Sequence, residues 1–311
     1  MTGVEISQKI IDEVSKVIIG KDEVIRQVMT AILANGNILI EDIPGVGKTT
    51  LAIAFSRAMS LDYNRVQFTP DVMPSDVTGF SMYNNKTTEF EYKPGAIMCN
   101  MFLADEINRT SSKTQSALLE AMEEHKVTVD GVTRAIPAPF TVIATQNPVG
   151  SVGTHMLPES QMDRFMFKLS MGYPSLENEI DMLKSKHAAV PMDSIEPVIT
   201  ADSLCEIQKE VENIFVHDSI YEYIATISAY TRQMENVELG ISPRGSVAIV
   251  KAAKATAYME GRDYVIPDDV KVILAPITRH RIVLSTKAKM NRITIDDIIN
   301  EVLEHIVVEK K

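Results

Sequence analysis

The chain has 311 residues, of which 45% are hydrophobic and 23% are charged, and its formal net charge is −11. This length favours two domains with a sizeable core, and the acidic balance argues against a nucleic-acid backbone as the main partner. No apolar run is long enough for a membrane span or signal segment, and the two cysteines lie far apart in sequence. We therefore expect a cytoplasmic protein with no membrane span and no nucleic-acid partner.

Two amphipathic helices are predicted at the N-terminus, over 7–18 and 22–34, because apolar residues recur there every three to four positions. Ile19 and Gly20 lie between them. Either they end the first helix against the core, or they form the apolar wall of a site for a base ring. The residues alone leave both interpretations open.

A phosphate-binding loop is predicted between a strand over 37–41 and a helix over about 49–60. Its glycines would let backbone N–H groups point at phosphate oxygens, and the helix N-terminus would add positive charge. Lys48 would reach the β- and γ-phosphates and the Thr49 hydroxyl would hold Mg²⁺. The strict pattern has glycine where this chain has Asp42, so a chance strand–turn–helix is the alternative. The predicted nucleotide-binding residues are Ile19, Gly20, Pro44, Gly45, Val46, Gly47, Lys48, Thr49 and Thr50.

A nearly continuous apolar strand over 98–105 ends in Asp105 and Glu106. Ligands of open α/β sheets bind at this edge. Asp105 would hold Mg²⁺ through water, and Glu106 would orient and deprotonate the attacking water. A second buried strand, over 140–145, places Asn147 beside the same edge, where it is either a ligand of the γ-phosphate or only a turn residue.

Further elements follow the same patterns, with a strand over 65–68, a helix over 112–124 and hairpins over 80–95 and 126–136. A last strand, over 165–170, begins directly after Arg164, which without further context could simply pair with Asp163. The composition then changes at residue 172, which we take as the boundary between domains 1–172 and 173–311.

The second domain is predicted to be helical, with helices near 176–183, 202–214, 220–227, 243–259, 267–274 and 295–304. Ser242 as N-cap and Pro243 in the first position begin one of them. This leaves Arg244 in the first turn, free to point at an anion. The basic cluster Arg279-His280-Arg281 is interpreted as a solvated surface.

Six motifs occur in an order that is highly specific. They are E-D-I-P-G-V-G-K-T-T-L-A at 41–52, L-A-D-E-I-N-R at 103–109, K-T-Q-S-A-L-L-E-A-M-E-E at 113–124, A-T-Q-N-P at 144–148, L-P-E-S-Q-M-D-R-F at 157–165 and S-P-R at 242–244. Together they resemble the MoxR-type AAA+ ATPases over nearly the whole chain. His155-Met156 departs from the tyrosine-proline pair that is usual in this family.

The resemblance implies an α/β fold: an αβα P-loop core around a parallel five-stranded sheet of order 5-1-4-3-2, followed by a small all-α lid. It implies binding of ATP/ADP with Mg²⁺, held by Thr49 and Asp105. The implied catalytic set is Lys48, Asp105, Glu106, the sensor Asn147, the arginine finger Arg164 acting in trans, and the second sensor Arg244. Stretches 80–95 and 126–136 match inserts of this family.

The function implied by the resemblance is ATP hydrolysis coupled to remodelling, maturation or metal insertion of a partner protein. The partner would typically carry a von Willebrand A domain, and the ATPase would form a hexameric ring. Two alternatives stay open at this stage, a DNA-acting AAA+ motor and an ATP-gated binding module without hydrolysis, with a small-molecule kinase as a weaker third. The net charge of −11 argues against the motor.

Overall fold

A parallel sheet of five strands forms the centre of the first domain in the computed structural model, which describes residues 2–43, 45–147, 157–185 and 192–306, without the side chains of 181–185. The strands lie in the order β2-β5-β8-β1-β9, which for the core strands alone is 5-1-4-3-2 read from the other edge. The predicted order is therefore confirmed. The strands are β1 (Ile38–Glu41), β2 (Tyr63–Gln67), β5 (Met101–Asp105), β8 (Thr141–Gln146) and β9 (Phe167–Leu169).

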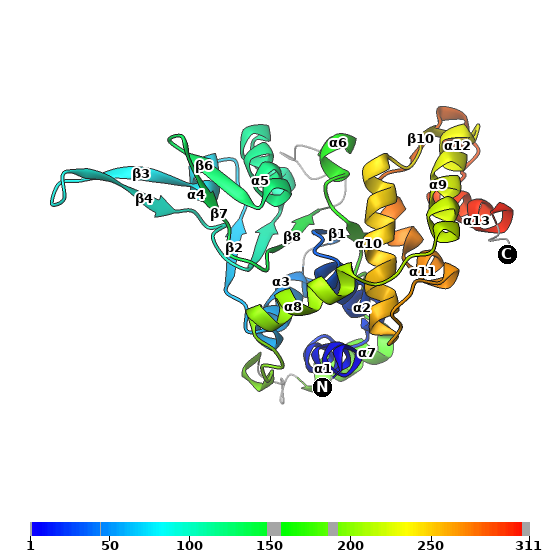
Figure 1. The fold of residues 1–311 in the computed structure, drawn as a ribbon, viewed down its shortest axis with the longest axis horizontal. Coiled ribbons are helices and arrows are strands. Elements are labelled where there is room, and N and C mark those ends of the chain that lie inside the picture. The colour runs from blue at the N-terminus through cyan, green and yellow to red at the C-terminus, as the bar shows by residue number, and fades with distance from the viewer. Residues whose placement is uncertain (1, 44, 148–156, 186–191, 307–311) are drawn as a thin grey trace.

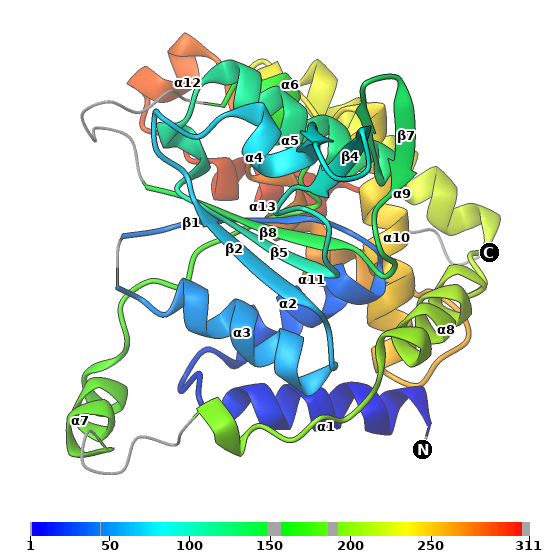
Figure 2. The ribbon, with the colours of Figure 1, turned by 90° about the vertical axis from the view of Figure 1, so that its left-hand side faces the viewer.

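Helices cover both faces of this sheet (Figure 2). On one face lie α1 (Gly3–Ser15), α2 (Asp22–Leu33) and α3 (Lys48–Ala58), and on the other α4 (Pro74–Thr78), α5 (Ser112–Glu124) and α6 (Glu159–Met162). Strand side chains alternate between faces. Leu103 of β5 accordingly packs in the cluster that contains α1–α3, whereas Phe102 and Ala104 pack in the cluster that contains α5. Burial on both faces explains the continuous apolar runs in the sequence.

Element boundaries differ from prediction where a side chain caps or ends an element. The first helix begins at Gly3 because the Thr2 hydroxyl accepts from the backbone N–H of Glu5 and the Glu5 carboxylate accepts from that of Thr2. Strand β5 begins at Met101 rather than at residue 98. The Asn100 side chain there bonds Asp62 N–H at 3.2 Å and the Pro139 carbonyl at 3.0 Å, which fixes the turn before the strand.

The two predicted hairpins are both present and project from the core (Figure 1). The first pairs β3 (Gly79–Asn84) with β4 (Glu89–Pro94), and the second pairs β6 (Lys126–Val129) with β7 (Val132–Ala135). The Arg134 guanidinium of the second lies 3.9 Å from the Tyr92 ring centroid of the first. This cation–π contact joins the two hairpins.

The rest of the described chain is mainly helical, and its helices are α7 (Leu176–Ser185), α8 (Ala201–Glu212), α9 (Asp218–Gln233), α10 (Pro243–Met259), α11 (Pro267–Thr278), α12 (Thr286–Met290) and α13 (Ile295–His305), with 3₁₀ turns at Ile107–Arg109 and Met192–Ser194. The expectation of an all-α lid is wrong in one detail. Strands β10 (Val237–Leu239) and β11 (Val283–Leu284) pair antiparallel, because the segments that flank α10 and α11 run side by side and satisfy each other's backbone groups.

The domain boundary at residue 172 stays a prediction. None of the helices in the described ranges is long and apolar enough to cross a membrane.

Candidate nucleotide-binding site

The loop between β1 and α3 has the backbone of a phosphate-binding loop. Gly45 and Gly47 have φ values of 87° and 94°, and Gly47 is the N-cap of α3. A residue with a Cβ atom rarely adopts this left-handed conformation. The two glycines therefore let the chain curl directly into the N-terminus of α3, where free N–H groups and the helix dipole favour an anion. Pro44 lies outside the described residues.

Asp42, which stands where the strict motif has glycine, ties this loop to the end of β9. Its Oδ2 accepts hydrogen bonds from the backbone N–H groups of Met171 and Gly172 at 2.5 and 2.7 Å and from the Ser170 hydroxyl at 3.1 Å. Asp42 is buried, with 6% of the residue exposed. Its φ is not positive, so no glycine is needed here, and the departure from the motif gives the loop a buried anchor.

Lys48 lies under this loop, with its side chain folded back onto it. The ammonium donates to the carbonyls of Asp42 at 2.7 Å and Ile43 at 3.3 Å. Burial lowers the pKa of Lys48, and this outweighs the opposing effect of the acidic side chains around it, including Asp105. A phosphate group would give the ammonium a charged partner in place of two neutral carbonyls.

Asp105 ends β5 and is held from two sides. The Thr145 hydroxyl of β8 donates to its Oδ1 at 2.6 Å, and Arg65 of β2 pairs with its Oδ2 at 2.7 Å. Neither partner was predicted. Thr145 lies inside the A-T-Q-N-P motif and could have been found there. The pair with Arg65 depends on the register of β2 against β5, which the sequence does not state.

Glu106 and Asn147 are in direct contact, as their shared sheet edge predicts. The Asn147 amide donates to Glu106 Oε1 at 2.9 Å, and Arg109 pairs with Oε2 at 2.7 Å. Burial alone would raise the pKa of Glu106, but the bonds from Arg109 and Asn147 outweigh it and lower the pKa. These two bonds thus favour the charged form of the Glu106 side chain. The backbone of Glu106 has a φ of 57°, which is uncommon for residues other than glycine.

These groups line one pocket of about 340 Å³. Its lining consists of Gly45, Gly47, Lys48, Thr49, Thr50, Arg65, Asp105, Glu106 and Asn147. The structure therefore brings together the predicted loop, both predicted acids and the predicted amide. A hydroxyl from Thr49 and a carboxylate from Asp105 face the same space, and oxygen donors of this kind suit Mg²⁺.

Ile19 and Gly20 lie beside the phosphate-binding loop. Ile18 is buried and approaches Gly47, while Ile19 is 39% exposed. The Asn178 side chain of α7 lies against Gly20 so closely that a Cβ atom there would be 1.8 Å from its amide nitrogen. The turn therefore packs against both the loop and the segment after β9.

The two predicted arginines lie elsewhere and meet each other. Arg164, just after α6, pairs with Glu123 Oε2 at 3.0 Å, and Arg244 of α10 pairs with Oε1 of the same carboxylate. Arg164 lines a separate cavity of about 610 Å³ beside α5. Neither arginine lines the phosphate pocket of its own chain. Asp163, offered as a partner for Arg164, bonds instead to Ser242 and Arg281.

The interpretation of Arg279-His280-Arg281 as a solvated surface is wrong for its last two members, which are each 4% exposed. His280 Nε2 lies 3.0 Å from the Phe165 carbonyl. Burial, together with the neighbouring Arg281 charge, lowers the pKa of His280 well below its usual value. Only Arg279 fits the prediction, in an exposed pair with Asp296. Charged residues are rarely buried unless paired, and the sequence gives no sign of the pairing.

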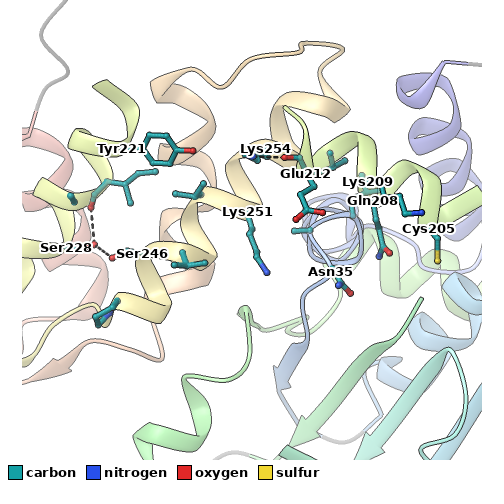
Figure 3. A pocket seen from close by; sticks show the side chains of 18 of the residues that line it. Asn35, Cys205, Gln208, Lys209, Glu212, Tyr221, Ser228, Ser246, Lys251 and Lys254 are labelled. Atoms are coloured by element: carbon teal, nitrogen blue, oxygen red, sulfur yellow. Dashed lines mark hydrogen bonds between the residues drawn. The ribbon is translucent and has the colours of Figure 1, made fainter. Parts of the chain in front are cut away.

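A larger cavity lies away from this chemistry. It has a volume of about 820 Å³ between α8, α9, α10 and the end of α2 (Figure 3). Neither a glycine-bearing loop nor a carboxylate pair lines it. The smaller pocket at the sheet edge, which is lined by both, is therefore the candidate nucleotide site.

Comparison with known proteins agrees with this geometry. Residues 37–167 match the family model described as "ATPase family associated with various cellular activities (AAA)", and residues 229–302 match the AAA lid domain. A crystal structure of a candidate ATPase from Cytophaga hutchinsonii superposes with a TM-score of 0.90 at 34% identity, covering 99% of this chain and 97% of that one. The fold and the family are those of an AAA+ ATPase.

Two relatives define the family more narrowly. The uncharacterized protein YeaC of Bacillus subtilis is 52% identical, with 96% of this chain and 94% of that protein covered. Chaperone MoxR1 of Mycobacterium tuberculosis is 38% identical, with 96% and 81% covered. The chain belongs to the MoxR family of AAA+ ATPases.

Proposed function

We propose that this ATPase works as a ring of identical subunits that uses ATP hydrolysis to remodel a partner protein. One observation carries the proposal. Glu106, bonded to Asn147, lines the same pocket as Lys48, while Arg164 and Arg244 both pair with Glu123 outside that pocket. A pocket that contains Glu106 and Lys48 but neither arginine is incomplete until another copy of the chain supplies the arginines.

Within one subunit, Lys48 and the N-terminus of α3 would bind the β- and γ-phosphates. Glu106 would accept a proton from the attacking water, and the Asn147 amide, bonded to Glu106, fixes the direction in which that carboxylate points. Phosphoryl transfer depends mainly on such positioning and on neutralising charge. Arg65 and Arg109 act through the acids they pair with and are positioning residues.

Thr49 and Asp105 would hold Mg²⁺ between them and the nucleotide, and the ion would neutralise phosphate charge. No group of three or more metal-binding side chains occurs in the described part of the chain. This suits an ion bound mostly by phosphates and water. Thr49→Val should abolish the Mg²⁺-dependent gain in nucleotide affinity, whereas Thr50→Val should keep it.

The arginines would act on a neighbour's nucleotide. An arginine finger is worth roughly 10³–10⁵ in rate, so an isolated subunit should hydrolyse ATP very slowly. The chaperone name of the Mycobacterium tuberculosis relative and the projecting hairpins of this chain support a protein as client. A hexameric ring and a client partner with a von Willebrand A domain remain expectations from the family resemblance.

The test is complementation between two inactive variants. Arg164→Ala should bind ATP but not hydrolyse it, and Lys48→Ala should fail to bind it. Mixing the two should restore part of the turnover, because Lys48→Ala subunits can supply Arg164 to intact pockets. Absence of recovery at every mixing ratio would contradict action in trans. Absence of turnover by the wild type at every concentration would contradict ATP-driven remodelling.

A further inference from the structure

The 820 Å³ cavity is an open groove whose walls are helices. Its floor is apolar and includes Leu33, Val211, Ile224 and Val250, and exposed Val247, at 56%, stands on its α10 side. Gln208 of α8 donates to the Ile32 carbonyl of α2 at 2.8 Å, which fixes one wall against the core. A groove of this kind suits the apolar face of a helix.

Positive charge surrounds this apolar floor, although the chain as a whole carries −11. Four cationic side chains and one carboxylate line the groove. Lys209 projects from the α8 wall and Lys251 from the α10 wall (Figure 3). Among the described residues neither ammonium has a hydrogen-bond or ion-pair partner. The groove therefore has a cation free on each wall and favours an occupant with acids on both flanks.

Helix α7 has the matching surface. Leu176 and Ile180, four residues apart on one side of the helix, are 75% and 40% exposed. Glu177 and Glu179 flank this apolar stripe on its two sides, by the 100° that each residue turns. Both are exposed, and neither carboxylate pairs with any of the side chains that the structure describes. An apolar stripe between two rows of acid is the complement of an apolar floor between two cations.

The two surfaces lie on opposite sides of one subunit. In Figure 2, α7 is on the side of the turn between β1 and α3, whereas α8 and α10 are on the other side. Pro243, which lines the groove, directly precedes Arg244 in the sequence, so α10 contributes to both. A contact that uses two different patches on opposite sides is head-to-tail, and such contacts form a ring when the rotation between subunits closes.

We propose that α7 of one subunit docks in the α8–α10 groove of the next, with Leu176 and Ile180 on the apolar floor and Glu177 and Glu179 against Lys251 and Lys209. This docking rests on the proposed ring. It would bring the nucleotide pocket of one copy, which adjoins α7 through Gly20 and Asn178, to the side of its neighbour that carries Arg244.

Charge reversal tests the docking. One variant carries Lys209→Glu and Lys251→Glu, a second carries Glu177→Lys and Glu179→Lys, and a third combines all four changes. Assembly is followed by sedimentation velocity with ATP, in a Glu106→Gln background so that turnover plays no part. We expect each pair of reversals to raise the concentration needed for assembly by about tenfold or more, since like charges now meet. The combined variant should recover most of the loss.

Lys289→Glu, at an exposed lysine of α12 that does not line the groove, is the matched control and should assemble normally. Cys205 gives a second measurement because it lines the groove. Its labelling by a maleimide should slow as subunits assemble. Cys99 will not interfere, because burial raises the pKa of its thiol to about 12.

The docking is overturned if both reversed pairs assemble like wild type, if the combined variant assembles worse than either, or if the protein is monomeric throughout. Unslowed labelling of Cys205 in an assembled sample also overturns it, and would leave the groove to a client or ligand. The mixing of Arg164→Ala with Lys48→Ala is independent of these results. If the mixture recovers ATPase turnover while both charge-reversed variants assemble like wild type, the proposed ring ATPase stands and only the docking of α7 in the groove is rejected.

Discussion

Arg281, at the end of α11, donates through Nε to Oδ1 of Asp163 at 2.7 Å, while its other nitrogens donate to backbone carbonyls of Asp163, Phe165 and Met166. Only 1% of the Arg281 side chain is exposed. The same Asp163 carboxylate accepts from the hydroxyl of Ser242, the N-cap of α10. One buried cation therefore fixes both the residue before Arg164 and the start of the helix that carries Arg244.

Arg281→Ala should therefore be strongly destabilising. It removes the cation that pairs with the Asp163 carboxylate and the donor to the backbone carbonyls of Asp163, Phe165 and Met166, and breaking a buried pair costs about 3–5 kcal/mol. Arg281→Lys should recover part of this, since an ammonium cannot make the same set of bonds. Urea unfolding measures both. Arg279→Ala, which removes the exposed pair with Asp296, is the control and should change stability by less than ~1 kcal/mol. Equal effects at positions 279 and 281 would contradict the clamp.

Arg109→Ala should move the acidic limb of the pH–rate profile to higher pH. The charged form of Glu106 is the active base. Without Arg109, which lowers the pKa of Glu106, the opposing effect of burial raises that pKa. In the wild type the pKa of Glu106 in the folded protein lies below its ordinary value of 4.5. Any stability that this group contributes is therefore present above about pH 4.5 and is lost as the pH falls through the folded pKa. ATPase rates from pH 4.5 to 8 measure the shift. Arg134→Ala, at the arginine that stacks on Tyr92, should leave the limb in place.

Asp42→Gly would make the loop fit the strict motif, yet we expect it to weaken nucleotide binding about tenfold or more. Three donors near the end of β9 lose a charged acceptor, and hydrogen bonds to charged groups are worth about 1.5–3 kcal/mol each. Equilibrium titration with a fluorescent ATP analogue gives the affinity. Asp71→Gly, in the connection after β2, is a comparison for a general effect of glycine. Unchanged affinity in Asp42→Gly would show that the anchor is dispensable.

Glu123→Gln should lower the subunit concentration at which ATPase activity is half-maximal, by several-fold. Glu123 binds both Arg164 and Arg244 and so competes with a neighbour's phosphates for them. Removing its charge lessens that competition. Glu124→Gln, on the next residue of α5 and lining the same cavity, is the matched control. A rise in the half-maximal concentration would instead indicate that Glu123 helps the arginines to act in trans.

The sheet and the loop could be predicted from local signals. Apolar runs of strand length, loop glycines and acids at a strand end place Lys48, Asp105, Glu106 and Asn147 at one edge, and the structure brings them together. Pairings between distant segments could not be predicted. Arg65 meets Asp105 forty positions along the chain, and the burial of Arg281 depends on how α11 packs against β9. The pair between Arg109 and Glu106 could have been predicted from the sequence, since Arg109 follows Glu106 by three positions.

Asp42 has a consequence for timing. The backbone groups that it holds, those of Met171 and Gly172, begin the segment that leads to α7. A shift of the phosphate-binding loop when nucleotide enters or leaves would therefore act on the first residues of that segment through these hydrogen bonds. If α7 docks in the next subunit, nucleotide binding or release in one pocket would move a helix that contacts the neighbouring subunit. Hydrolysis would then proceed sequentially around the ring rather than independently in each subunit.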